Sequence, residues 1–426
     1  MAAAQLRRSL TASLVRVAVL AALFALLFQC TVHPSSHPAK ATATAADAAR
    51  AGMRQLLSRQ AAAVLHRDRP AFLGTVDPRA TGYLTRQRKV FDDLADVPLA
   101  AWSYRLVATG AFPLPPAADG TGRTAAQVEL RYRLTGFDTQ PVSATYYLTF
   151  AHRDGRWYVA GDDDGTAAGK RSAVELWDQG PVTVVRGRYS LVLGSGPAAG
   201  LRRYADEADE AVPQVRHAWP DGWTGKVVVE VPGTLARMAA LLGAEPADYR
   251  NFAAVTAGEA GGTATFHSDR VIINPEAFAG LSEFGRQTTL THETTHVATR
   301  ATTTANTPLW LSEGVADWTA YRTSGRTARE IAAELSTAVT AGRVPAALPT
   351  DADFHATDAA ALSRAYEGGW LACRMVADQW SPARLTDLYR AVAAGGSLDS
   401  HLRTTLGLTL PAFTARWRAY LQQELA

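Results

Sequence analysis

The chain has 426 residues, which is longer than one ordinary domain and enough for two or three. Its hydrophobic fraction of 47% and charged fraction of 19% are typical of globular proteins and exclude a disordered chain. The net charge is only +3, and the arginines are scattered with no run longer than two, so we expect no nucleic-acid-binding patch.

Residues 1–30 have the layout of an export signal, because three arginines precede an apolar run over residues 17–28. Sequences of the A-x-A type first occur near residues 41–45, which is late for cleavage, so an uncleaved membrane anchor and a cleaved signal both stay open. Gln29 before Cys30 argues against lipoprotein processing. In either case we expect the rest of the chain to be extracytoplasmic, held at the cytoplasmic membrane or secreted.

The next part of the sequence predicts a linker and then an α+β domain. Residues 31–45 are rich in Pro, Ser, Ala and Thr, which is typical of a linker. A helical pattern begins near Ala46, and segments such as residues 125–137 then alternate apolar and polar side chains, as antiparallel strands do. Over 46–165 this order resembles the cone-shaped fold of the nuclear-transport-factor and ketosteroid-isomerase type, a fold-level likeness that implies no activity.

Three adjacent aspartates, Asp162–Asp164, mark the expected end of this domain. The spaced oxygen ligands of a calcium loop are absent there, so we expect a solvated turn. From residue 172 to residue 426 the pattern predicts a second α+β domain. Short strands alternate with helices near 197–218 and 233–243, and after Pro275 the pattern is almost wholly helical. We therefore expect a mixed sheet followed by a helical lobe, with a cleft between them.

The stretch "LTHETTHVATR", residues 290–300, contains the pattern H-E-x-x-H. On a helix, His292 and His296 project from one face, so both imidazoles can bind one tetrahedral Zn²⁺. Glu293 then lies beside the open coordination position, where it can act as a general base.

A catalytic zinc needs a third protein ligand. The metzincin pattern is excluded, because Thr299 and Thr302 occupy its glycine and histidine positions. The segment "PLWLSEGVADW", residues 308–318, offers Glu313. Sixteen residues separate it from His296, enough for the helix to end, turn and return. Asp317, one turn further, can accept the N–H of a ligating histidine.

Within the same segment, Trp310 and Leu311 are expected in the core. Gly314 is expected to let its helix approach the H-E-x-x-H helix closely.

The two segments together resemble the peptidase MA-like family of gluzincin zinc metallopeptidases, including exported, membrane-anchored actinobacterial members. The resemblance covers about 175–426. It implies a two-lobed, thermolysin-like fold, Zn²⁺ as the cofactor and a peptide or protein substrate. It also implies His292, His296 and Glu313 as metal ligands, Glu293 as the catalytic base and Tyr366 as the tyrosine that polarises the scissile carbonyl.

The G-x-M-E-N segment of gluzincin aminopeptidases has no counterpart, so aminopeptidase specificity is not expected. Tyr366 has a structural alternative, packing at the start of a buried helix. His267 and His355 are weaker alternatives as site residues.

The expected function is an exported, membrane-tethered zinc metallopeptidase, in which a zinc-activated water attacks the peptide bond and Glu293 takes its proton. The strand in "RVIINPEAF", residues 270–278, is expected to hold extended substrate at the edge of the cleft. The alternative is a catalytically silent, zinc-stabilised envelope module that binds another protein. The sequence leaves open the substrate, endo- versus exo-cleavage, the role of the N-terminal domain and the oligomeric state.

Overall fold

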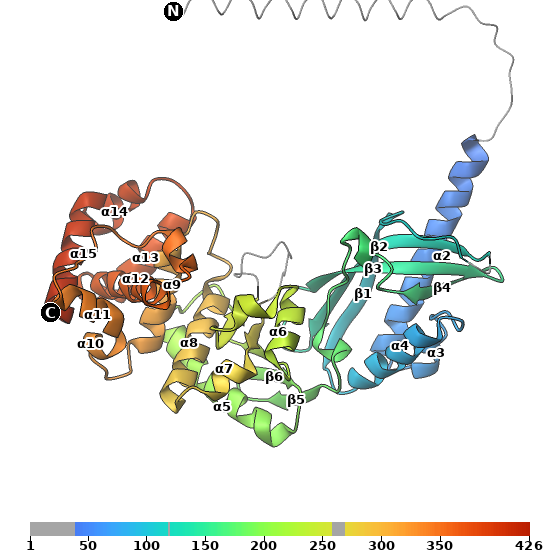
Figure 1. Cartoon of the computed structure of the whole chain (residues 1–426), viewed down its shortest axis with the longest axis horizontal. Helices are drawn as coiled ribbons and strands as arrows, with labels where there is room; N and C mark the ends of the chain where they lie inside the picture. The colour runs from blue at the N-terminus through green and yellow to red at the C-terminus, as the bar shows by residue number, and fades with distance from the viewer. Residues whose placement is uncertain (1–38, 118–119, 258–268) are drawn as a thin grey trace, which may run out of the picture. The chain divides into compact units, whose positions relative to one another are not determined.

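The computed structural model describes residues 39–117, 120–257 and 269–426 (Figure 1). The chain divides into two units between Ala51 and Gly52. Its helices and two sheets confirm the α+β class. The expected leader, residues 1–30, lies outside the described residues, and none of the helices that are described is long and apolar enough to cross a membrane.

Helix α2 (Ala39–Leu65) starts earlier than the expected position near Ala46, so residues 39–45 are helical rather than linker. Alanine dominates this stretch and has the highest intrinsic helix propensity, which explains the early start. The helices α3 (Arg69–Leu73) and α4 (Thr81–Asp93) follow. Phe72 of α3 and Phe91 of α4 pack together with ring centroids 5.0 Å apart.

The first sheet is an antiparallel meander of four strands in the order β1-β2-β3-β4. The strands are β1 (Leu99–Thr109), β2 (Gly122–Leu134), β3 (Val142–Arg153) and β4 (Arg156–Gly161). In β2 the alternation predicted from the sequence is observed, because Val128, Leu130 and Tyr132 are buried on one face. The β3–β4 turn is Asp154–Gly155, both with positive φ, as a two-residue hairpin requires.

The three aspartates after β4 are not simply solvated. Asp162 accepts a hydrogen bond from Arg86 of α4 at 2.7 Å, and Asp164 accepts one from Arg123 of β2 at 2.7 Å. These ion pairs connect the end of the meander to α4 and to the sheet. The short helices η1 (Thr166–Ala168) and η2 (Leu176–Asp178) then lead to the second sheet.

The second sheet is mixed and has the order β5-β6-β7-β9-β8. Its strands are β5 (Thr183–Arg186), β6 (Ser190–Gly194), β7 (Val227–Val231), β8 (Ala254–Thr256) and β9 (Val271–Ile273). The central strands β6, β7 and β9 are parallel, and the outer strands β5 and β8 are antiparallel to their neighbours. The connecting helices and short helix are α5 (Ala198–Ala218), α6 (Leu235–Leu242), η3 (Pro246–Tyr249) and α7 (Pro275–Ala279).

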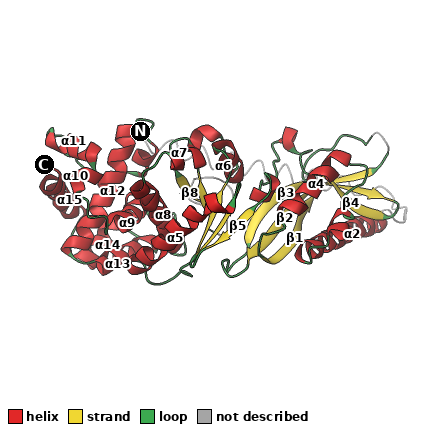
Figure 2. Cartoon of the chain, turned by 90° about the horizontal axis from the view of Figure 1, so that it is seen from below, coloured by secondary structure: helices red, strands yellow, loops and turns green. Residues whose placement is uncertain are grey.

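Beyond α7 the described chain is helical, as expected after Pro275 (Figure 2). The helices are α8 (Glu283–Thr299), α9 (Leu309–Tyr321), α10 (Ala328–Ile331), α11 (Ala333–Thr340), η4 (Asp351–His355), α12 (Ala359–Gln379), α13 (Pro382–Ala393), α14 (Leu398–Leu406) and α15 (Leu410–Leu425). Trp310, Leu311 and Trp417 are among the residues of its core, each at most 3% exposed, which confirms the two expected core residues of α9.

The two sheets share one hydrophobic cluster, in which Trp102 and Tyr132 of the meander and Trp177 of η2 belong with Val228 and Ile272 of the second sheet. A buried ion pair also joins them. Arg270, next to β9, donates from both terminal nitrogens to the Asp138 carboxylate at 2.7 and 2.8 Å. The meander therefore packs against the second sheet through a continuous core, and its definition as a separate domain over 46–165 stays a prediction.

Candidate metal centre

Helix α8 presents its histidines on a stretch rich in threonine. Ser282 caps the helix by accepting a hydrogen bond from the Gly285 amide at 3.1 Å. Two buried threonine hydroxyls bond to carbonyls four residues earlier: Thr291 bonds to Gln287 and Thr295 bonds to Thr291. These bonds satisfy polar groups that burial would otherwise leave without water, so the threonine-rich helix can pass through the interior.

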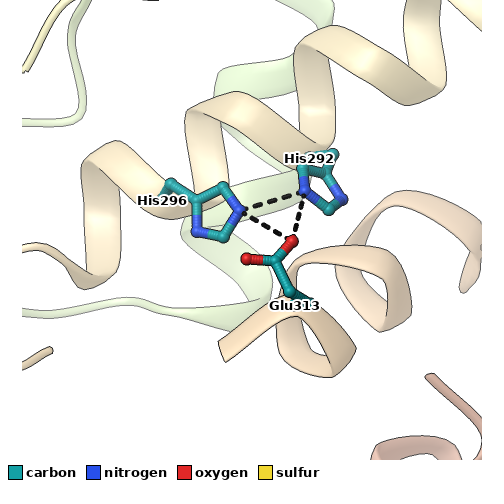
Figure 3. Close-up of side chains that lie close together, drawn as sticks. All are labelled: His292, His296 and Glu313. Atoms are coloured by element: carbon teal, nitrogen blue, oxygen red, sulfur yellow. Dashed lines mark hydrogen bonds and ion pairs between the residues drawn. The ribbon is translucent and has the colours of Figure 1, made fainter. Parts of the chain in front are cut away.

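His292, His296 and Glu313 converge on one point (Figure 3). The two histidines come from successive turns of α8, and Glu313 comes from the neighbouring helix α9. The Nε2 atoms of the histidines lie 3.0 Å apart. The Glu313 Oε2 atom lies 3.2 Å from Nε2 of His292 and 3.6 Å from Nε2 of His296.

These distances fit three ligands of one tetrahedral zinc ion. With zinc–nitrogen and zinc–oxygen distances of about 2.0–2.1 Å, tetrahedral geometry places ligand atoms about 3.3–3.4 Å apart, and the three observed separations bracket that value. Two imidazoles and one carboxylate are also a donor set that catalytic zinc sites use. The residues present therefore fit the metal that the sequence predicts.

Asp317 lies behind His292. Its Oδ1 atom is 2.8 Å from Nδ1 of His292, which suits an Nδ1–H group donating to the carboxylate and leaves Nε2 facing the centre. Burial acts to lower the pKa of His292, but the charge and hydrogen bond of Asp317 and the hydrogen bond of Glu313 raise it to about 10. Burial acts to raise the pKa of Glu313, yet the two imidazoles hold it well below its usual range. This pattern of charge favours a cation among the three ligand atoms.

Glu293 is buried beside the centre, at 7% exposure. The hydroxyl of Thr256, on strand β8, is 2.8 Å from its Oε2 atom and 3.0 Å from its backbone carbonyl. Thr256 therefore ties the carboxylate of Glu293 to the sheet. Sequence reasoning missed Thr256, because the contact joins positions 37 residues apart and no local pattern marks a threonine in a three-residue strand.

A close contact between α9 and α12 lies directly beside Glu313 in the chain. A Cβ atom on Gly314 would lie 2.4 Å from the carbonyl oxygen of Gly369, and one on Gly369 would lie 2.8 Å from the carbonyl oxygen of Trp310. The glycine at position 314 does permit a close helix approach, but the partner is α12. The expected partner α8 was wrong, because Gly314 faces away from the ligand side of α9.

The ligands open into a cavity of about 1060 Å³ that is also lined by Glu293, Asp317 and Tyr366. Tyr366 packs edge-to-face against Phe354, with ring centroids 5.0 Å apart. A second tyrosine, Tyr321, lines the cavity one helical turn beyond Asp317. Tyr321 follows Asp317 by four residues in the same helix, a spacing that places both on one face and could have been read from the sequence. Of the weaker histidine alternatives, His355 lines the cavity, and His267 lies outside the described residues.

The strand expected to hold substrate is not at the edge of the sheet. The strand within residues 270–278 is β9, which pairs with β7 on one side and β8 on the other, so its main-chain groups are already used. In the described part of the sheet, β8 is the edge strand beside β9, and its residues Ala254–Thr256 line the cavity. The spatial order of the strands in the sheet differs from their order in the chain, and short apolar segments in the sequence do not encode it.

Comparison of the chain with models of known protein families and with curated proteins found no match.

Proposed function

We propose that the protein is a zinc-dependent metallopeptidase, exported and tethered to the membrane by its N-terminal segment. The observation that supports it most directly is the convergence of His292, His296 and Glu313 within 4.8 Å of one another, with Glu293 lining the same cavity. A structural zinc site has four protein ligands and needs no neighbouring base, whereas three ligands beside a buried carboxylate suit catalysis.

Bound zinc would act as a Lewis acid that polarises the scissile carbonyl and acidifies water. Side chains of the protein would transfer the proton, position the reacting groups and stabilise the oxyanion. Glu293 would take a proton from the attacking water and pass it to the leaving amine. Thr256 would hold the Glu293 carboxylate in position, and Asp317 would keep His292 in the tautomer that faces the centre. Tyr366 would donate a hydrogen bond to the developing oxyanion.

We further propose the finer fold assignment that the sequence suggests. The meander with its three helices would be a nuclear-transport-factor-like domain, and the mixed sheet with the helical lobe would be a gluzincin domain of the peptidase MA-like type. The order of helices before strands in the first part, and of sheet before helices in the second, supports this assignment.

The test compares Glu293→Gln with the wild type and with Glu283→Gln, a control on the same helix at an exposed position outside the cavity. We expect both variants to bind about one zinc per chain, as the wild type does. Glu293→Gln should lose hydrolysis of a peptide mixture by at least about a hundredfold, whereas Glu283→Gln should keep it.

The proposal would fail if the purified wild type bound no zinc, or if Glu293→Gln cleaved as fast as the wild type. Zinc binding without any cleavage by the wild type would instead support the zinc-stabilised binding module.

A further inference from the structure

The described lining of the cavity is acidic, whereas the chain as a whole has a small positive net charge. Although the chain as a whole carries a net charge of +3, no lysine or arginine is among the described residues that line the cavity. Six carboxylates do line it: Glu245, Asp248, Glu293, Glu313, Asp317 and Glu367. A divalent metal would neutralise two of these charges, and the remaining field attracts cations.

Four of the six carboxylates belong to the metal centre or accept hydrogen bonds from the backbone. Glu293, Glu313 and Asp317 belong to the metal centre. Glu367 accepts hydrogen bonds from the backbone amides at the start of α11, at 2.6 and 3.3 Å, and its burial raises its pKa to about 7. Glu245 and Asp248 differ, because both are exposed and neither has an ion pair with any residue that the structure describes.

Two aromatic residues of the same short segment, Tyr249 and Phe252, also line the cavity. Their ring centroids are 6.3 Å apart in an edge-to-face arrangement. Phe252 is 36% exposed, one of three large hydrophobic side chains so exposed in the described chain. An exposed aromatic ring next to carboxylates can contact both the aliphatic stem and the charged head of a long cationic side chain.

Hydrogen bonds from Asn274 hold the backbone of this segment. The side-chain amide of buried Asn274 donates to the carbonyl of Tyr249 at 3.1 Å, and the Asn274 backbone amide donates to the carbonyl of Ala253 at 2.9 Å. These two bonds fix both ends of the segment 249–253 on the sheet. The rings of Tyr249 and Phe252 are therefore carried by an anchored piece of backbone, and Asp248 directly precedes it.

We infer that Glu245, Asp248, Tyr249 and Phe252, here called the acidic–aromatic rim, form a subsite for a cationic group of the substrate. This inference rests on the proposed function for its claim that the bound peptide is a substrate. The substrate class is then a peptide with a lysine or arginine side chain, or a free amino terminus, near the cleaved bond. With no cationic side chain in the described lining to bind a terminal carboxylate, recognition of a substrate by its C-terminus is disfavoured.

The first experiment measures binding in the presence of a metal chelator, so that turnover does not interfere. The probes are labelled short peptides of alternating lysine and alanine, or of alternating glutamine and alanine, both with acetylated amino termini. We expect the full-length wild type to bind the lysine peptide about fivefold more tightly at low salt, with the difference shrinking as salt is added.

The double variant Glu245→Gln/Asp248→Asn should lose most of this preference. Phe252→Leu keeps an apolar side chain but loses the ring face, and should lose about half of it. The control is Asp206→Asn/Glu210→Gln, which removes two exposed carboxylates from α5 outside the cavity and should keep the preference. A wild type without any preference, or a preference that survives in Glu245→Gln/Asp248→Asn, would overturn the inference.

A third probe, the glutamine peptide with a free amino terminus, identifies the source of the cation. Binding as tight as that of the lysine peptide would assign the rim to the α-amine, and weak binding would assign it to a side chain. The second experiment measures chelator-sensitive cleavage of the same peptides with zinc present. Cleavage without charge preference would overturn the subsite and leave the proposed function standing. Charge preference without cleavage would overturn the proposed function and, with it, the claim that the bound peptide is a substrate.

Discussion

Replacing Gly314 with alanine tests whether the contact between α9 and α12 positions the metal ligand Glu313. The added Cβ atom would lie 2.4 Å from the carbonyl oxygen of Gly369 and 2.7 Å from the sulfur of Cys373. Ordinary contacts of a Cβ atom begin at 3.4 Å, so the two helices must separate by about 1 Å. The obstacle is backbone, which cannot rotate away as the end of a side chain can.

Two effects should follow from that separation. Overpacking costs about 1–3 kcal/mol, and the higher helix propensity of alanine recovers up to about 1 kcal/mol, so we expect a net loss of about 1–2 kcal/mol in the free energy of unfolding. Because Glu313 is the adjacent residue, its carboxylate should move by more than the ~0.2 Å that a zinc ligand tolerates. We expect zinc affinity to fall at least about tenfold.

The assay is chemical denaturation together with competitive zinc titration of the purified protein. Gly200→Ala is the matched control, because Gly200 also lies in a helix but has nothing within 4 Å of the added Cβ atom. It should raise stability by up to about 1 kcal/mol and leave zinc affinity unchanged. If Gly314→Ala had the zinc affinity and stability of the wild type, the helix contact would not position Glu313 and the reasoning would be refuted.

Three further substitutions test other contacts. Thr256→Val keeps the shape of the side chain but removes the hydroxyl that holds Glu293, so kcat should fall about tenfold with KM and zinc content unchanged; a change in KM alone would contradict this role. Desolvation by the surrounding groups raises the pKa of Asp178 to about 7 from 3.8, although the side chain is exposed and solvent screens much of the effect, so stability should fall only slightly as pH rises from about 4 to 7. Asp178→Asn should remove that decline, at most about 1 kcal/mol for a solvent-screened carboxylate, in denaturation experiments at pH values on either side of the window; an unchanged slope would count against it. Asp138→Asn leaves the buried guanidinium of Arg270 without its bidentate partner. The free energy of unfolding, measured by denaturant titration, should fall by about 3–5 kcal/mol. A loss below about 1 kcal/mol would show that the ion pair does not stabilise the contact between the sheets.

The sequence by itself determined the features that depend on local periodicity. The spacing of four residues placed His292 and His296 on one face of a helix, and the same spacing in the next helix placed Glu313 and Asp317 together. Alternation predicted the strands of the meander, because a half-buried strand repeats every two residues. These patterns are short in range, and burial on one side of an element is enough to produce them.

Only the tertiary structure decided which elements meet. The order of the strands placed β8 instead of β9 at the edge of the second sheet and brought Thr256 to Glu293. The packing of α9 against α12, not α8, explained the glycine at position 314. The acidic–aromatic rim likewise appeared only when the short segment 245–252 was folded onto the wall of the cavity. Such pairings join residues far apart in the chain, and no local repeat encodes them, because many partners satisfy the same pattern of apolar faces.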